Sequence, residues 1–157
     1  MGLSVFFSHN MQDKELVDSL KAEAKQGDID IYTFDGDVQA GEYVDKKIRE
    51  RIGASDALVV LLSAQGVASP YVQQEIGVAL ALGKPVVPLV EKGVEIHRLA
   101  MLQGREVIFF ERENPGAVKP TLMGQLTRVL NNKNKQIVIG LGLVVVLTLL
   151  IYMASRK

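Results

Sequence analysis

The sequence has no cysteine and only two histidines, His9 and His97. Without cysteine there can be no disulfide, no zinc–thiolate site and no cysteine nucleophile. Two histidines are too few for a histidine-rich metal site, so we expect no bound metal. Charge of either sign is also not in excess, because 18 lysines and arginines balance 18 aspartates and glutamates. Since nucleic-acid-binding proteins usually have a basic excess, we expect no nucleic acid as a partner.

The 157 residues are enough for one domain with a hydrophobic core. Over residues 1–130, short apolar runs alternate with segments whose apolar residues recur at helical spacing. This alternation predicts a parallel sheet covered by helices on both faces. We therefore expect an α/β fold with a flavodoxin-like, five-stranded parallel sheet. Strands are predicted at residues 3–7, 29–34, 57–62, 86–90 and 106–110, and helices at residues 13–25, 43–52, 69–83, 95–102 and 121–130.

Two of the predicted strands have distinctive patterns. Residues 57–62 are apolar at every position, as in a strand from the middle of a parallel sheet. Pro88 interrupts residues 86–90 and predicts a strand end or a bulge there, because proline has no backbone N–H.

The helix predicted at residues 69–83 contains an unusual acid. Ser69 is a good N-cap, Pro70 suits the first helical position, and Gly83 can adopt the left-handed conformation that ends a helix. Glu75 is the only charged residue of this segment, and no basic residue lies three or four positions away. It also lies beyond the first turn, where the helix dipole favours acids. A lone acid among small and apolar residues indicates a cleft; the alternative is a solvated surface carboxylate.

The expected topology gives a second reason to examine the same region. Flavodoxin-like sheets bind ligands beyond the carboxyl ends of their strands, where the strand order reverses. Here this switch lies between the first and third strands. It brings together Ser8, His9, Ser63 and the start of the helix at residues 69–83.

The C-terminal region differs in composition from the rest of the chain. Residues 131–136 are polar and predict a linker, whereas residues 137–153 carry no charge and are mostly valine, leucine and isoleucine. At 1.5 Å per residue the apolar segment reaches about 26 Å, close to the ~30 Å hydrocarbon core of a membrane. We therefore expect a single transmembrane helix at residues 137–153, followed by a short basic tail at 154–157. It would act as a tail anchor, with the domain in the cytoplasm; the alternative is a buried terminal helix.

Four motifs, taken in order, resemble a TIR (Toll/interleukin-1 receptor) domain of the prokaryotic kind. The resemblance covers about residues 3 to 110. The motifs are Val5-Phe6-Phe7-Ser8-His9 followed by Asp13, residues 55–63 around the third strand, Ser69-Pro70-Tyr71-Val72-Gln73-Gln74-Glu75-Ile76, and Gly83-Lys84-Pro85-Val86-Val87-Pro88.

The resemblance implies an activity and a set of site residues. Many TIR domains cleave NAD, so NAD is implied as a substrate rather than as a bound cofactor. The family's catalytic glutamate lies four residues after an aromatic residue, usually tryptophan, and this corresponds to Glu75 after Tyr71. Residues 35–41 resemble the family's mobile loop beside the pocket, and residues 7–10 match the edge that receives the nucleotide. The predicted substrate-binding residues are Phe7, Ser8, His9, Asp35, Gly41, Ser63 and Tyr71.

One carboxylate is sufficient for this chemistry. Breaking the nicotinamide–ribose bond builds oxocarbenium character, as in glycoside hydrolysis. Nicotinamide leaves as a neutral group, so no general acid is required. Glu75 could hold the ribose hydroxyls and stabilise the developing positive charge. Attack by water would give ADP-ribose, and attack by the adenine would give a cyclic product; the sequence does not choose between them.

Three functions are compatible with these residues. The first is a membrane-tethered enzyme of signalling or defence that cleaves NAD; TIR domains often assemble before they act, so self-association is expected, and confinement to a membrane would favour it. The second is a non-enzymatic adaptor that binds other TIR domains through residues 35–41. The third is an enzyme similar to the nucleoside deoxyribosyltransferases, a related fold that also uses a glutamate.

Overall fold

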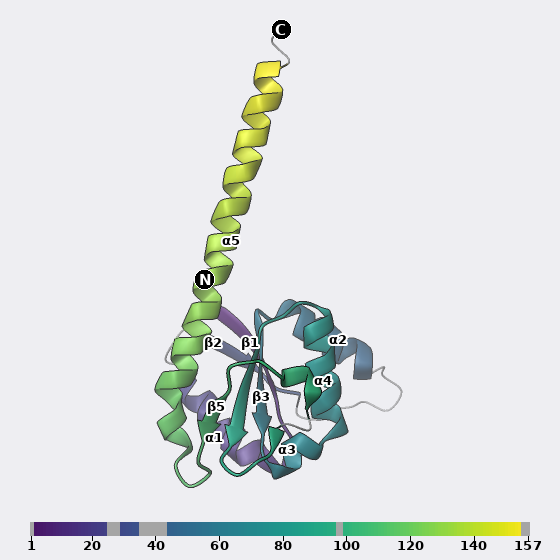
Figure 1. Ribbon diagram of the computed structural model, residues 1–157, viewed down its shortest axis with the longest axis vertical. Helices are drawn as coiled ribbons and strands as arrows, with labels where there is room; N and C mark the ends of the chain where they lie inside the picture. Colours follow the sequence, from purple (N-terminus) through teal and green to yellow (C-terminus); the bar gives the residue numbers. More distant parts are fainter. Residues whose placement is uncertain (1, 25–28, 35–43, 97–98, 155–157) are drawn as a thin grey trace.

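The computed structural model describes residues 2–24, 29–34, 44–96 and 99–154 (Figure 1). Its centre is a five-stranded sheet in which all paired strands are parallel, with the order β2-β1-β3-β4-β5. The predicted fold class and the switch between the first and third strands are thereby confirmed. The strands are β1 (Leu3–Ser8), β2 (Ile29–Tyr32), β3 (Ala57–Leu62), β4 (Val86–Glu91) and β5 (Ile108–Phe110).

Helices cover both faces of this sheet (Figure 1). One face packs against α1 and the first part of α5, and the other against α2 and α4, each over its own hydrophobic cluster. The helices are α1 (Lys14–Ala24), α2 (Val44–Ala54), α3 (Ala64–Ala68), α4 (Pro70–Ala81) and α5 (Lys119–Ala154), with short 3-10 helices at Met11–Asp13, Ala100–Leu102 and Pro115–Val118.

The strand period of two decides which side chain meets which layer of helices. In β1, Val5 and Phe7 belong to the cluster under α1 and α5, whereas Phe6 belongs to the cluster under α2 and α4. Ser8 follows Phe6 by two residues, so its side chain is directed toward α4. β3 is buried at every position, as predicted for a central strand.

Several local predictions were wrong. The described residues of the helix predicted at 95–102 form no α-helix, and Ala100–Leu102 among them form a 3-10 helix; the strand predicted at 106–110 begins at Ile108. Pro88 lies inside β4, in register with Val60; it neither ends the strand nor forms a bulge, because the pairing with β3 is unbroken on both sides of it. The strand tolerates it because β5 pairs with β4 only from Leu89 onward, so Pro88 has β3 as its one strand partner. In addition, residues 64–68, for which the sequence pattern predicts no helix or strand, form the separate helix α3.

The C-terminal helix is longer than predicted. α5 is continuous from Lys119 to Ala154 and extends well beyond the domain (Figure 1). Residues 131–136, predicted as a linker, are therefore helical. Lys133 explains how the polar stretch is held, because its Nζ lies 2.5 Å from Oδ1 of Asp56, just before β3.

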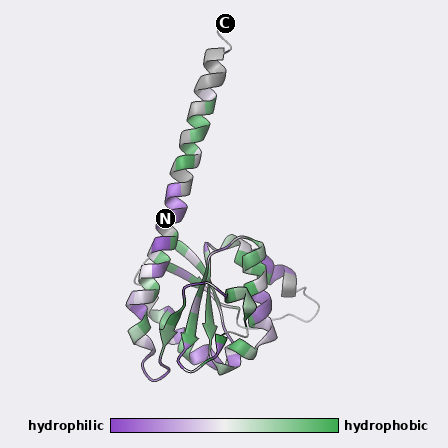
Figure 2. Cartoon of the chain, viewed as in Figure 1, coloured by the Kyte–Doolittle hydropathy of each residue, from purple (hydrophilic) through white to green (hydrophobic). Residues whose placement is uncertain are grey.

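The predicted transmembrane helix is not supported. Figure 2 shows hydrophobic residues in the part of α5 beyond the domain, and Ile139, Leu141 and Leu147 there are exposed. Among the residues that the structure describes, however, none of the helices combines the length and the apolar composition that a membrane span requires. The expected anchor, and membrane localisation with it, therefore has no support here.

Candidate functional site

Glu75 lies in the middle of α4, on the side that packs against the sheet. Val72 precedes it by three residues and Ala79 follows it by four, so all three occupy one helical face, and both neighbours are fully buried. The Glu75 residue itself is only 6% exposed. The alternative of a solvated surface carboxylate is therefore excluded, and the acid lies at the inner side of the helix.

Ser8 provides the hydrogen-bond donor for this buried carboxylate. Its hydroxyl, at the carboxyl end of β1, donates to Oε2 of Glu75, and both residues are buried. The contact joins residues 67 positions apart in the sequence. It forms because the alternation along β1 directs Ser8 toward α4, where Glu75 faces inward. The structure thus brings together two of the predicted site residues.

Burial controls the charge of Glu75. Removal from water raises the pKa of Glu75 from 4.5 to about 7, and the hydrogen bond from Ser8 lowers the pKa and offsets part of that effect. Burial therefore favours the protonated, neutral form of this carboxyl more than water does. A group with such a pKa in a buried position is typical of an active site.

The other predicted residues lie in different environments. Phe7 is buried in the cluster on the opposite face of the sheet, under α1 and α5. His9 is half-buried, with Nδ1 3.4 Å from the backbone oxygen of Phe7. Tyr71, one turn before Glu75, is 71% exposed, so its ring does not cover the carboxylate. Asp35 and Gly41 lie outside the described residues.

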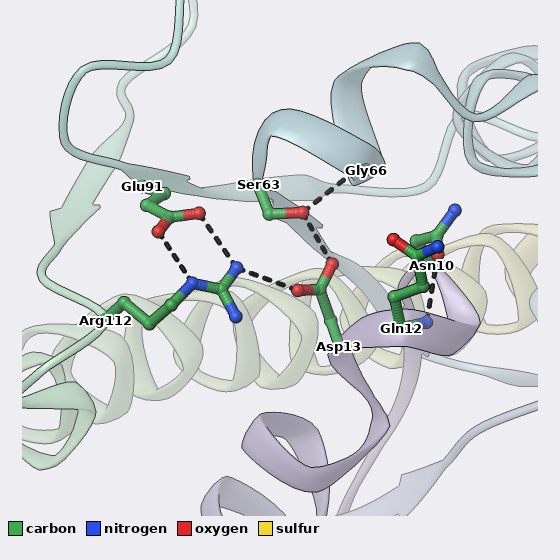
Figure 3. A network of polar contacts seen from close by, with 7 residues as sticks. All are labelled: Asn10, Gln12, Asp13, Ser63, Gly66, Glu91 and Arg112. Atoms are coloured by element: carbon green, nitrogen blue, oxygen red, sulfur yellow. Dashed lines mark hydrogen bonds and ion pairs between the residues drawn. The ribbon is translucent and has the colours of Figure 1, made fainter.

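Ser63 belongs to a separate polar network at the same edge of the sheet (Figure 3). Its hydroxyl donates to Oδ2 of Asp13 at 2.5 Å and accepts from the N–H of Gly66, which caps α3. Oδ1 of Asp13 accepts from Nη2 of Arg112 at 2.9 Å, and Arg112 is also held by both carboxylate oxygens of Glu91. The structure therefore places Ser63 beside Asp13 and not beside Glu75.

A cavity of about 600 Å³ lies beside this network. Asp13, Glu91 and Arg112 line it, together with Gln12 and Gln65. Neither Glu91 nor Arg112 is among the site residues predicted from the sequence. A signal was present, because each charged residue stands at the carboxyl end of a parallel strand, or two residues beyond it, and such ends meet at one edge of the sheet.

No metal site is evident in the part of the chain that the structure describes. No group of three or more histidine, aspartate or glutamate side chains is arranged there to hold an ion.

A protein-family model described as "TIR domain" matches residues 5–122. The chain belongs to the TIR domain family. The match covers most of the chain and includes β1 from Val5 onward, α4 and the network at the carboxyl ends of the strands. A search of curated proteins found no match for this TIR domain.

Solved structures show the same fold at low sequence identity. The CMP N-glycosidase BcmB of Clostridium botulinum is 20% identical, with a TM-score of 0.58 over 76% of this chain and 98% of that chain. The TIR domain of the Toll-related receptor TRR-2 of Hydra magnipapillata is 13% identical, with a TM-score of 0.63 over 78% and 97%. The TIR domains of the activated Roq1 resistosome are 18% identical, with a TM-score of 0.52 over 80% and 74%.

Proposed function

We propose that this TIR domain cleaves the nicotinamide–ribose bond of NAD, giving ADP-ribose or a cyclic form of it, in signalling or defence. The observation that carries the proposal is the Glu75 carboxyl, which is buried on the inner side of α4 and hydrogen-bonded by Ser8 at the switch point of the sheet. This is where parallel α/β sheets bind their ligands.

The properties of Glu75 suit this reaction. Its ionised form would stabilise the positive charge that develops on the ribose as nicotinamide departs. The bound nicotinamide ring is itself positively charged, and an adjacent positive charge favours the ionised form of a carboxyl. Ser8 orients the carboxylate, so Glu75 would act as a fixed electrostatic group without transferring a proton to the leaving nicotinamide.

The reaction class has separate support from a protein of the same fold. BcmB is described as a CMP N-glycosidase, which is an enzyme that breaks the bond between a base and its sugar. The family to which this chain belongs also includes enzymes that cleave NAD. An N-glycosidic bond is therefore the common target, and a pyrimidine nucleotide is the alternative substrate to NAD.

Assembly is part of the proposal. The Roq1 structure is described as an activated resistosome containing TIR domains, so TIR domains of this fold occur in assemblies. We infer that this chain also self-associates or binds other TIR domains. A non-enzymatic adaptor would use the same association without cleavage.

Substitution of Glu75 tests the proposed activity. The whole 157-residue chain at high concentration is incubated with NAD, and released nicotinamide is measured between pH 6 and pH 8. We expect kcat/KM, which reports the protein without bound NAD, to increase with pH through about 7 as Glu75 ionises. Glu75→Gln should lower the rate by roughly 100-fold, the scale for loss of an electrostatic group. Glu50→Gln, at an exposed position of α2, is the matched control and should leave the rate unchanged.

The outcomes separate the alternatives. Equal rates for the parent protein and Glu75→Gln would refute the assignment of Glu75. Cleavage of CMP or deoxynucleosides, with none of NAD, would move the activity to a nucleotide substrate. Concentration-dependent association without cleavage of any of these compounds would support the adaptor.

A further inference from the structure

Asp13 is a buried acid that the proposed reaction does not use. Its side chain is 1% exposed, yet it accepts hydrogen bonds from Ser63 at 2.5 Å and from Arg112 at 2.9 Å (Figure 3). A buried carboxylate is costly unless it is paired and hydrogen-bonded. The chain supplies both partners from far away in sequence, 50 and 99 residues from Asp13.

Both partners are themselves held in place. Arg112, just after β5, is fixed by the two oxygens of Glu91 at 2.7 and 2.9 Å, a bidentate pair of defined geometry. Ser63, directly after β3, is fully buried and also caps α3. Asp13 is therefore tied to the carboxyl ends of three strands, β3, β4 and β5.

Asp13 and Ser8 form the two ends of one tight loop between β1 and α1. Within it, the N–H of Asp13 donates to the backbone oxygen of Asn10 at 2.9 Å, and the Asn10 side chain accepts from the N–H of Gln12. With so few residues between Ser8 and Asp13, and these bonds inside the loop, a shift at one end is transmitted to the other. Ser8 is the residue that donates to Glu75.

We infer that Asp13, clamped by Ser63 and Arg112, is a positioning residue that holds the β1–α1 loop so that the Ser8 hydroxyl points at Glu75. The inference rests on the proposed function, because the group being positioned is the proposed catalytic residue. The side-chain hydrogen bonds described for Asp13 go to Ser63 and Arg112 and not to Glu75, so Asp13 acts through the loop and Ser8.

The decisive measurement is the pKa of Glu75. It is determined from the NMR resonance of the side-chain carboxyl carbon, recorded as a function of pH in the whole chain. Ser8→Ala should raise this pKa, because the hydrogen bond that lowers it is lost. Asp13→Asn should raise the pKa in the same direction, by about one unit or a tenfold change in the ionisation constant. Removal of a negative charge would by itself lower the pKa of a neighbouring acid, so a rise identifies the lost Ser8 contact.

Two further variants sharpen the test. Arg112→Lys keeps the charge but cannot reproduce the bidentate geometry, and it should also raise the pKa of Glu75. This variant substitutes for Asp13→Asn if the latter does not fold. In a Ser8→Ala background, Asp13→Asn should produce no further rise, because both substitutions remove the same contact. Glu111→Gln, in the exposed pair with Lys92, is the matched control and should leave the pKa unchanged.

Activity provides the second measurement. If NAD is cleaved, Asp13→Asn and Ser8→Ala should lower kcat by a similar factor, about tenfold, with little change in KM. An unchanged or lowered pKa of Glu75 in folded Asp13→Asn or Arg112→Lys would overturn the positioning role. A raised pKa in a protein that cleaves no NAD would leave the positioning role standing and refute the proposed function alone.

Discussion

At the scale of single residues, Glu75 is placed where it costs stability. Burial raises the pKa of Glu75 from 4.5 to about 7, so the folded protein retains a proton that the unfolded chain releases above pH 4.5. Stability contributed by the protonated form is complete below 4.5 and is lost as the pH rises through about 7. The shift corresponds to about 3 kcal/mol at most. Active-site groups commonly reduce stability in this way.

This cost gives a prediction for Glu75→Gln. Glutamine has nearly the same shape, can accept from Ser8 and carries no titratable proton. We compare the free energies of unfolding of Glu75→Gln and the parent protein. The advantage of Glu75→Gln should be larger at pH 8 than at pH 4.5, by about 1–3 kcal/mol. Urea denaturation of both proteins at the two pH values measures the difference. A difference that does not depend on pH would show that Glu75 has an ordinary pKa in the folded protein.

The same scale shows what sequence reasoning can reach. Glu75 was predicted because a lone acid within an apolar helical segment is a local pattern, and Ser8 because it ends a recognisable strand. The clamp on Asp13 was not predicted, because its partners stand 50 and 99 residues away and only the folded sheet brings them together. Side chains alternate between the two faces of β1, so their faces follow once the register of the strand is known. This alternation places Phe7 on the face opposite to Glu75.

At the scale of elements, α3 shows how a short helix is fixed by a tight contact. A side-chain Cβ at Gly66 would lie 2.5 Å from the backbone oxygen of Leu61, whereas one at Gly77 in α4 meets no atom within 4 Å. Gly66 also donates its N–H to Ser63, the cap of α3. This close approach requires a glycine, and a five-residue helix has too few residues to show a helical period in the sequence.

The two glycines form a matched pair for a test. Gly66→Ala should lower the free energy of unfolding by about 1–3 kcal/mol, because backbone must move to admit the methyl group. Gly77→Ala should raise it by about 0.5–1 kcal/mol, because alanine is the better residue inside a helix. Thermal and urea denaturation of both variants measures the two effects. Equal tolerance of both substitutions would mean that α3 does not pack this closely on β3.

At the scale of the whole molecule, α5 joins the domain to the segment that extends beyond it. Its first turns pack on the sheet through Leu122 and Leu126. Its polar middle contacts the amino end of β3, where Lys133 pairs with Asp56. The sequence predicted a break at residues 131–136 because several asparagines and lysines occur together there. Tertiary contact overrides that local composition, since Lys133 gains a mostly buried partner by remaining in the helix.

The Lys133–Asp56 pair yields a prediction on how firmly α5 is held. Burial raises the pKa of Asp56, but the hydrogen bonds from Lys133 and from the Ser4 N–H, with the charges of Lys133 and Lys84, outweigh it and bring the pKa below 3.8. A carboxyl with a lowered pKa stabilises the fold at pH values above its pKa in the unfolded chain. This contribution is lost as the pH falls through its pKa in the folded protein.

Lys133→Met should therefore lower the free energy of unfolding by about 1 kcal/mol at pH 7, and this loss should shrink as the pH is lowered below 3.8. Urea denaturation across this range measures it, with Lys135→Met, at an exposed position of the same helix, as the control that should cost nothing. Equal stability of the two variants at pH 7 would show that the ion pair does not hold α5 against the sheet.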